Sequence, residues 1–226
     1  MPDKALRVEG LTAGYSGSVV VDGISLEVQP GEVVALLGRN GVGKSTAVAA
    51  IAGTIPAAAG SIRIGDNDAS GRTPSRRFQL GLRTMRQDRP VIGALSVREN
   101  LALVGADVAY AVELFPFLSE KLPQLAGTLS GGEQKMLALA RQAANPGDVW
   151  ILDEPTEGLQ PSNVDRCSEI IRIAARKGRA VLLVEQHLAM ALGTADRWYL
   201  MEKGAVKQSG KVDDSTFDTV ARELAI

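Results

Sequence analysis

The chain of 226 residues is 45% apolar and 23% charged, so it can bury a sizeable core without disulfide bonds or a structural metal. Its 25 basic and 26 acidic side chains nearly cancel, which argues against a nucleic acid as the main partner. A single cysteine fits a reducing compartment and the apolar runs are too short to cross a bilayer, so we expect a soluble cytoplasmic protein that reaches a membrane through a partner.

Strand patterns occupy both ends of the chain. Ala5–Val8 and Ser25–Val28 are predicted strands, with glycine-rich turns between them. Val33–Leu37 is a continuous apolar run, which is typical of a strand covered on both faces in a parallel sheet. Further predicted strands are Val149–Leu152, Ala180–Val184, Trp198–Met201 and Ala205–Lys207.

Helical patterns lie between these strands. Ser96 and Glu99 have the spacing of a capping box and predict a helix through Leu103. Other predicted helices are Ser45–Gly53, Gln134–Ala144 and Pro161–Arg176. Strands that alternate with helices indicate an α/β fold. We expect one domain over residues 1–226, with an α/β core at 1–87 and 146–226 and a helical subdomain at 88–145.

A glycine-rich segment follows the apolar run at Val33–Leu37 and matches the G-x-x-x-x-G-K-[ST] pattern of a phosphate-binding loop. Its glycines let backbone amides wrap around phosphate oxygens at the start of a helix. Lys44 would place its charge on the β- and γ-phosphates, and the Ser45 hydroxyl would bind Mg²⁺. The residues of the loop are Gly38, Arg39, Asn40, Gly41, Val42, Gly43, Lys44, Ser45 and Thr46.

Two acidic residues end the predicted strand Val149–Leu152. Asp153 follows the strand directly and is the expected Mg²⁺ ligand of a phosphate-loop enzyme. Glu154 comes one residue later, where its carboxylate can orient or deprotonate an attacking water. The pair therefore predicts a nucleotide-hydrolysing site.

The segment Leu129–Gln134 reads Leu-Ser-Gly-Gly-Glu-Gln and resembles the signature sequence of ATP-binding cassette (ABC) ATPases. The resemblance implies a phosphate-loop NTPase cassette with a RecA-like core, an N-terminal antiparallel β subdomain and an α-helical subdomain. It also implies a head-to-tail dimer, in which each ATP lies between one phosphate loop and the partner's signature. On this basis Ser130, Gly131 and Gly132 bind nucleotide across the dimer.

Other positions of the chain are similar to the same family. Tyr15 stands where the family places an aromatic ring on adenine, although a plain strand-end tyrosine is the alternative. Gln87 matches the glutamine that reaches Mg²⁺ and senses the membrane partner, but Arg86 and Asp88 beside it depart from the usual sequence. Gln186 takes the place of the usual histidine at the γ-phosphate. His187 lies one residue later, and we expect it to be non-catalytic because that offset turns its side chain away.

The segments that differ from the usual family sequence resemble one branch of the family. Leu183–Gln186, Glu157–Ser162 and Glu113–Pro116 are similar to ATPases of importers for branched-chain amino acids, urea and short amides, and Gly38–Lys44 is most like the urea branch. The resemblance implies two transmembrane permease subunits, a second ATPase subunit of the same or a similar kind, and an external solute-binding protein. The chain would then lie on the inner face of the plasma membrane and use ATP and Mg²⁺.

Two alternatives stay open at this point. One is an ABC ATPase that acts on ribosomes, DNA or iron–sulfur assembly, but those members usually carry two cassettes or long insertions. The other is a regulatory module that binds nucleotide with little turnover, which Gln160 and Gln186 favour because both replace usual catalytic-loop residues. Glu154 and the intact signature speak against this second alternative.

Overall fold

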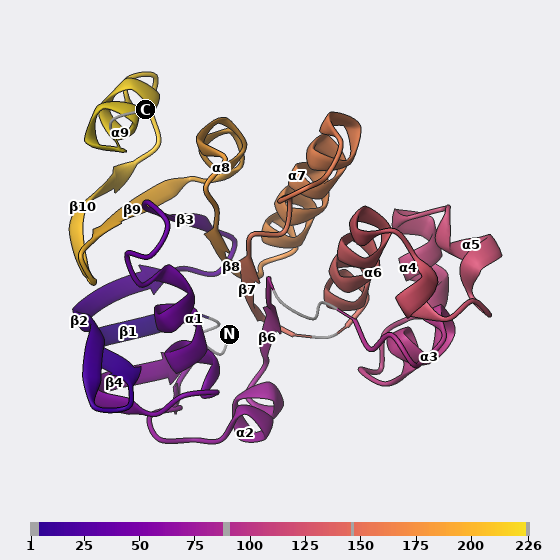
Figure 1. Cartoon of the computed structure of the whole chain (residues 1–226), viewed down its shortest axis with the longest axis horizontal. Helices are drawn as coiled ribbons and strands as arrows, with labels where there is room; N and C mark the ends of the chain where they lie inside the picture. The colour runs from indigo at the N-terminus through magenta and orange to yellow at the C-terminus, as the bar shows by residue number, and fades with distance from the viewer. Residues whose placement is uncertain (1–4, 88–90, 146, 225–226) are drawn as a thin grey trace.

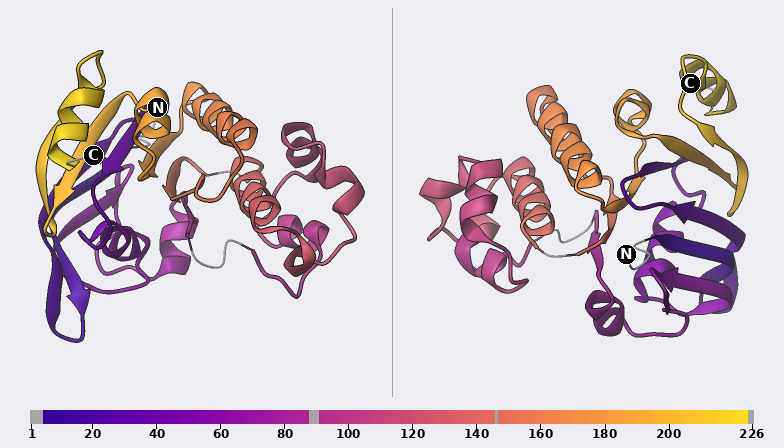
Figure 2. Two further views of the ribbon diagram at one scale, coloured as in Figure 1. Left: turned by 45° about the horizontal axis from the view of Figure 1, so that its top comes forward. Right: turned by 180° about the vertical axis from the view of Figure 1, so that it is seen from behind.

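A computed structural model describes residues 5–87, 91–145 and 147–224 of the chain. Asp88, where the predicted helical subdomain begins, and Pro146, where the second core segment begins, lie outside the described residues. Figure 1 shows strands and their covering helices on one side and a group of short helices on the other, while Figure 2 gives the same arrangement from two further directions.

The larger sheet has six strands within the described residues, in the order β10-β9-β3-β8-β7-β6. All neighbouring pairs are parallel except the closing hairpin of β9 and β10. The strands are β3 (Val33–Leu37), β6 (Leu82–Met85), β7 (Val149–Asp153), β8 (Ala180–Val184), β9 (Arg197–Glu202) and β10 (Ala205–Lys211). The prediction of buried parallel strands is confirmed for β3, β7 and β8.

Both faces of this sheet are covered because successive side chains of a strand point to opposite sides. On β3, Val33 and Leu37 join the apolar cluster that contains helices α6 (Gly131–Ala143) and α7 (Pro161–Arg176). Val34, between them, joins the cluster formed with helix α1 (Lys44–Ala52) and the smaller sheet. The polar carboxyl ends of the strands are therefore the points at which the buried sheet can meet a ligand.

The smaller sheet is antiparallel and has the order β2-β1-β4-β5. Its strands are β1 (Leu6–Tyr15), β2 (Ser18–Val28), β4 (Ala57–Ile64) and β5 (Asn67–Asp68). The first two extend well beyond the predicted segments, because shifts in register between them let the pairing continue past Gly10 and Gly14. No strand was predicted at β4, whose first residues are three alanines and a glycine without a β-branched pattern.

The helical group contains α3 (Val97–Ala102), α4 (Val108–Leu114), α5 (Leu118–Lys121), a short 3₁₀ turn (Ala126–Thr128) and α6. The predicted capping box is present, since the Ser96 amide donates to Glu99 over 2.7 Å and the Glu99 amide to the Ser96 hydroxyl over 3.2 Å. Helix α6 begins at Gly131, three residues before the predicted start. Ser130 and Glu133 form a second capping box there.

The remaining helices are α2 (Pro74–Gln79), α7, α8 (Leu188–Thr194) and α9 (Thr216–Leu224). Helix α7 has the predicted bounds, whereas α2, α8 and α9 were not predicted because their apolar patterns span too few residues. In the described part of the chain, none of the helices has both the length and the apolar character that a bilayer crossing requires.

Candidate active site

The carboxyl ends of β3, β6, β7 and β8 meet at one edge of the larger sheet, and a cavity of about 320 Å³ opens there. Its walls combine segments that lie up to 166 positions apart in the sequence. They are formed by Val20, Asn40, Gly41, Gly43, Lys44, Ser45, Thr46, Gln87, Glu154, Glu157 and Gln186. Most of the residues that the sequence singled out are therefore brought together.

The phosphate loop needs its glycines for backbone reasons. Gly38, Gly41 and Gly43 have φ values of 152°, 78° and 107°, in a region that disfavours side chains. A Cβ atom on Gly38 would also lie 2.7 Å from the Met201 carbonyl oxygen. Helix α1 starts directly after Gly43 with no side chain capping its first amides. These amides are free to bind an anion at the helix N-terminus.

Lys44 supplies the positive charge of this loop. Its side chain is only 5% exposed, and its Nζ atom donates to the carbonyl oxygens of Gly38 (2.7 Å) and Arg39 (3.0 Å). Burial lowers the pKa of Lys44, while the nearby carboxylates of Glu154 and Asp153 act in the opposite direction. The ammonium group therefore lies inside the loop, between its backbone and the two acids.

Asp153 ends β7 at the foot of the loop, where its carboxylate accepts a hydrogen bond from the Ser45 hydroxyl. Burial, and then the charge of Glu154, raises the pKa of Asp153 to about 6. Its Oδ1 atom is buried and has no hydrogen-bond partner among the described residues. A carboxylate with an unused oxygen beside a hydroxyl is the hard-oxygen donor set that Mg²⁺ prefers, so these residues fit that ion.

Glu154 is held from three sides. Its backbone has a φ of 50°, unusual for a residue with a side chain, and its amide donates to the Val184 carbonyl oxygen over 2.9 Å. One carboxylate oxygen accepts a hydrogen bond from Gln87 Nε2 over 2.7 Å, and the other accepts one from Gln186 Nε2. The two glutamines thus fix the carboxylate toward the phosphate loop.

His187 does not share this arrangement. Its side chain is exposed and makes no hydrogen bond in the described part of the chain, while its backbone amide donates to Glu185 over 3.4 Å. It lines an adjoining cavity of about 510 Å³, together with Glu154 and Gln186. Of the two neighbours, Gln186 is the one that contacts Glu154.

Glu185 was not identified as a site residue from the sequence. It is 2% exposed and accepts hydrogen bonds from the Thr156 hydroxyl (2.6 Å), the Thr156 amide (3.1 Å) and the Gln186 amide (3.1 Å). It therefore joins the turn after Glu154 to the turn that carries Gln186. The sequence could have indicated Glu185, because it is a charged residue directly after the apolar run of β8.

Lys135, on α6, was also missed. Its Nζ atom donates to the backbone oxygens of Glu157 (2.6 Å) and Glu154 (3.3 Å), and it forms an ion pair with the Glu157 carboxylate at 3.2 Å. A side chain of the signature helix thus reaches the loop that holds Glu154. The sequence could have indicated Lys135, because it follows the signature directly.

Several predicted residues lie outside the 320 Å³ cavity. Tyr15 is 50% exposed at the end of β1, and Val20, not Tyr15, is the residue of this hairpin that lines the cavity. Ser130 and Gly132 line a separate cavity of about 630 Å³ near Leu159. The Arg39 side chain turns away from the cavity and donates to Leu224.

We predict that replacing Asp153 by Asn stabilises the nucleotide-free fold. The folded chain keeps the Asp153 proton up to about pH 6, whereas the unfolded chain has the ordinary pKa of 3.8. The ionised group therefore lowers stability above pH 6, and this cost fades as the pH falls toward 4. At about 1.4 kcal/mol per pKa unit, Asp153→Asn should raise the free energy of unfolding by roughly 1–3 kcal/mol at pH 7.5.

Urea unfolding with EDTA, at pH 7.5 and pH 4.5, measures this difference. The gain should shrink at the lower pH, and Asp165→Asn, at an exposed position on α7, should show little change at either pH. A loss of stability for Asp153→Asn at pH 7.5 would contradict the assignment of a buried, uncompensated carboxylate.

Comparison with known proteins identifies the family of this chain. The family model described as ABC transporter matches residues 21–157. The chain is 39% identical over 210 residues to the high-affinity branched-chain amino acid transport ATP-binding protein BraG of Pseudomonas aeruginosa, covering 89% of this chain and 90% of that protein. It is 31% identical to the probable branched-chain amino acid transport ATP-binding protein LivF of Archaeoglobus fulgidus, over 92% and 93% of the two chains.

A solved structure shows the same fold. A nucleotide-free ATP-binding cassette from an ABC transporter superimposes with a TM-score of 0.86 at 23% identity, covering 100% of this chain and 99% of that one. The match extends over the phosphate loop, the helical group and the final helix alike. The match over residues 21–157 and the 39% identity to BraG show the family: the chain belongs to the ABC transporter family, as one of its ATPase cassettes.

Proposed function

We propose that this chain is the ATP-hydrolysing subunit of an importer for branched-chain amino acids. The observation that carries the hydrolytic part is the position of Glu154, which two glutamine amides hold beside the phosphate loop. The solute is inferred from the names of the two relatives. Other relatives are importers of different solutes, such as the ribose import protein RbsA of Bacillus subtilis at 29% identity. The urea preference expected from Gly38–Lys44 stays a prediction.

ATP would bind with its phosphates at the loop and the start of α1. The amides of the loop and Lys44 would contact the β- and γ-phosphates, and Ser45 and Asp153 would hold Mg²⁺. Mg²⁺, when bound, neutralises charge on the phosphate oxygens. Glu154 then accepts the proton of the attacking water or orients that water for in-line attack. Gln87 and Gln186 keep the carboxylate in place, so that it need not reorganise during the reaction.

The signature belongs to a second copy in this proposal. Ser130 caps α6, and it lines with Gly132 a cavity separate from that of the chain's own phosphate loop. A head-to-tail dimer would place Ser130, Gly131 and Gly132 of each copy against the nucleotide of the other. A dimeric cassette bound to ADP and phosphate, with a TM-score of 0.82 at 20% identity, shares the fold.

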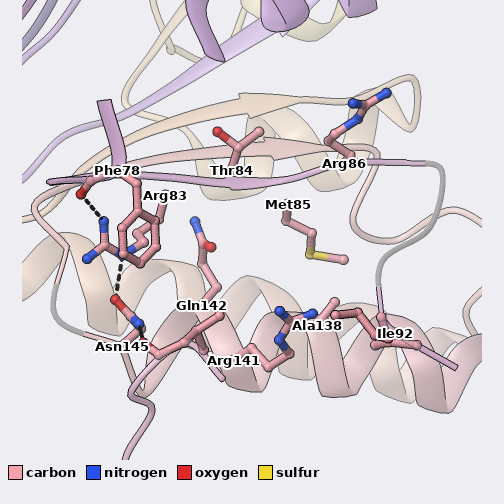
Figure 3. A pocket seen from close by; sticks show the side chains of 12 residues that line it. Phe78, Arg83, Thr84, Met85, Arg86, Ile92, Ala138, Arg141, Gln142 and Asn145 are labelled. Carbon is pink, nitrogen blue, oxygen red and sulfur yellow. Dashed lines mark hydrogen bonds between the residues drawn. The ribbon is translucent and has the colours of Figure 1, made fainter. Parts of the chain in front are cut away.

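We propose that the permease subunits contact a cavity of about 270 Å³ between β6, α2 and α6 (Figure 3). The exposed apolar side chains of Phe78 and Ile92 line it, and Arg86 connects it to the active site because Gln87 is the next residue. A partner seated there would contact the strand end that positions Glu154. Two permeases and an external solute-binding protein would complete the importer on the inner face of the membrane.

Glu154→Gln tests the hydrolytic proposal. The variant should bind ATP as the parent chain does but lose about 10²–10⁴-fold in turnover, because the proton acceptor is gone. Nucleotide affinity by calorimetry, turnover by phosphate release and dimer formation by gel filtration give the three readouts. Glu120→Gln, at an exposed position on α5, is the matched control. Turnover within about twofold of the parent would refute the role of Glu154.

Gln186 and His187 can be separated by single substitutions. Gln186→Ala should slow turnover about tenfold, since it removes a hydrogen bond to the catalytic carboxylate worth about 1.4 kcal/mol. His187→Ala should leave turnover nearly unchanged. Steady-state ATPase rates of both variants measure this, and the reverse pattern would assign the γ-phosphate position to His187.

The permease contact predicts a third effect. Ile92→Asp should lower the amount of permease that copurifies with this chain about tenfold or more, because it places a charge in an apolar contact. Leu125→Asp is the control: Leu125 is a similarly exposed apolar residue of the helical group that does not line this cavity. Equal copurification of the two variants would place the permease contact elsewhere.

A further inference from the structure

The phosphate loop is tied to the last helix of the structure. Arg39, at the second position of the loop, donates from Nε (2.9 Å) and Nη2 (2.6 Å) to the carbonyl oxygen of Leu224. Leu224 is the final residue of α9, and 185 positions separate it from Arg39. The last carbonyl groups of a helix have no donor within the helix. Arg39 therefore serves as a charged cap at the C-terminus of α9.

Apolar packing and an ion pair also hold α9 in place. The fully buried Val220 and the nearly buried Leu224 join the apolar cluster under the sheet, and α9 packs beside α8 (Figure 1). Lys207 of β10 adds an ion pair with Glu223 at 2.7 Å on the solvent side. Arg39, Glu223 and Leu224 also line a cavity of about 170 Å³ beside β9. The guanidinium group of Arg39 reaches from the loop to the helix.

The backbone of Arg39 contacts the other end of the loop. Its carbonyl oxygen accepts a hydrogen bond from Lys44 Nζ, the group proposed to bind the phosphates. The same residue thus connects the phosphate-binding cation to α9.

We propose that Arg39 is a positioning residue that couples nucleotide binding at the phosphate loop to the docking of α9. The docked helix orders the loop before the nucleotide arrives, which lowers the entropy cost of binding. By reciprocity, a bound nucleotide holds Arg39 in place and stabilises the docked helix by the same factor. The inference rests on the proposed binding of ATP at this loop and adds α9 as a regulated element.

Two measurements on Arg39→Ala test the coupling. The first is the Kd for the magnesium complex of a non-hydrolysable ATP analogue, measured by calorimetry. The second is hydrogen–deuterium exchange of the α9 amides with and without that analogue. In the parent chain, the analogue should slow exchange in α9. In Arg39→Ala, the Kd should rise about 3–10-fold and the slowing should disappear. Arg39→Lys keeps one donor and should restore part of the slowing.

Two controls separate coupling from simple loosening of the helix. Lys207→Ala removes the ion pair of α9 without touching the loop, so exchange should be faster in both states while the analogue still slows it. Arg222→Ala removes an exposed side chain that donates to the Asp218 backbone oxygen of its own helix, and should behave as the parent chain. Fold stability of each variant is checked by thermal unfolding; Arg39 is exposed, so its loss should leave the fold intact.

The outcomes distinguish the two proposals. If the parent binds the analogue, but Arg39→Ala shows the parent Kd and keeps the slowing in α9, the coupling is wrong and the nucleotide site stands. A second result to watch for is that, in Lys207→Ala, the analogue loses its effect on amide exchange in α9 as fully as it does in Arg39→Ala. In that case any loss of an α9 contact has the same effect, and the specific role of Arg39 is refuted. If the parent itself does not bind the analogue, the proposed function and the coupling both fail.

Discussion

Charged side chains are buried at one edge of the larger sheet, and the loops around them must supply their partners. Lys44, Asp153, Glu154 and Glu185 are each no more than 5% exposed there. A buried charge costs several kcal/mol unless it is paired or hydrogen-bonded. The surrounding loops supply those partners: the phosphate-loop backbone for Lys44, two glutamine amides for Glu154, and the turn at Thr156 for Glu185. Asp153 keeps an oxygen without a partner, which is where a cation fits.

The same burial makes the site chemically effective. Apolar clusters on both faces of the larger sheet exclude water from the strands, so the charges at the strand ends act through a medium of low dielectric constant. Fixed amides and an ammonium group in such a medium stabilise charge without reorganising. Each loop of the site follows a different strand of one rigid sheet, and hydrogen bonds at Glu154 and Glu185 join neighbouring loops. In the proposed importer, a permease contact beside Gln87 would therefore be transmitted to the Glu154 carboxylate.

Much of this architecture could be predicted from the sequence, because its signals are local. Runs of four or five apolar residues identified β3, β7 and β8, and the spacing of Ser96 and Glu99 identified the start of α3. The phosphate loop and the pair Asp153 and Glu154 each follow an apolar run directly, so the sequence predicted them at strand ends. Gln87 and Gln186 converge on Glu154, while the contacts with Mg²⁺ and the γ-phosphate that the resemblance implied stay predictions.

The features that escaped prediction depend on distant contacts. Strand β4 has an alanine-rich start and forms because β1 offers it an edge, so its own sequence carries little signal. The start of α6 is an exception: the capping box of Ser130 and Glu133 that begins the helix at Gly131 is a local signal, which the prediction missed. The contacts of Lys135 and Glu185 and the bond from Arg39 to Leu224 join segments that are 19 to 185 positions apart. No local pattern reports such pairs.

In the proposed head-to-tail dimer, a second copy of the chain completes each hydrolytic site. Mixing two inactive variants tests it most directly: Lys44→Ala, which lacks the phosphate cation, and Gly131→Asp, which places a negative charge at the start of α6 where a Cβ meets no atom within 4 Å. In a head-to-tail dimer, the loop of one variant meets the intact signature of the other. The account predicts that the mixture hydrolyses ATP although neither variant does so alone. A mixture as inactive as its components would contradict it.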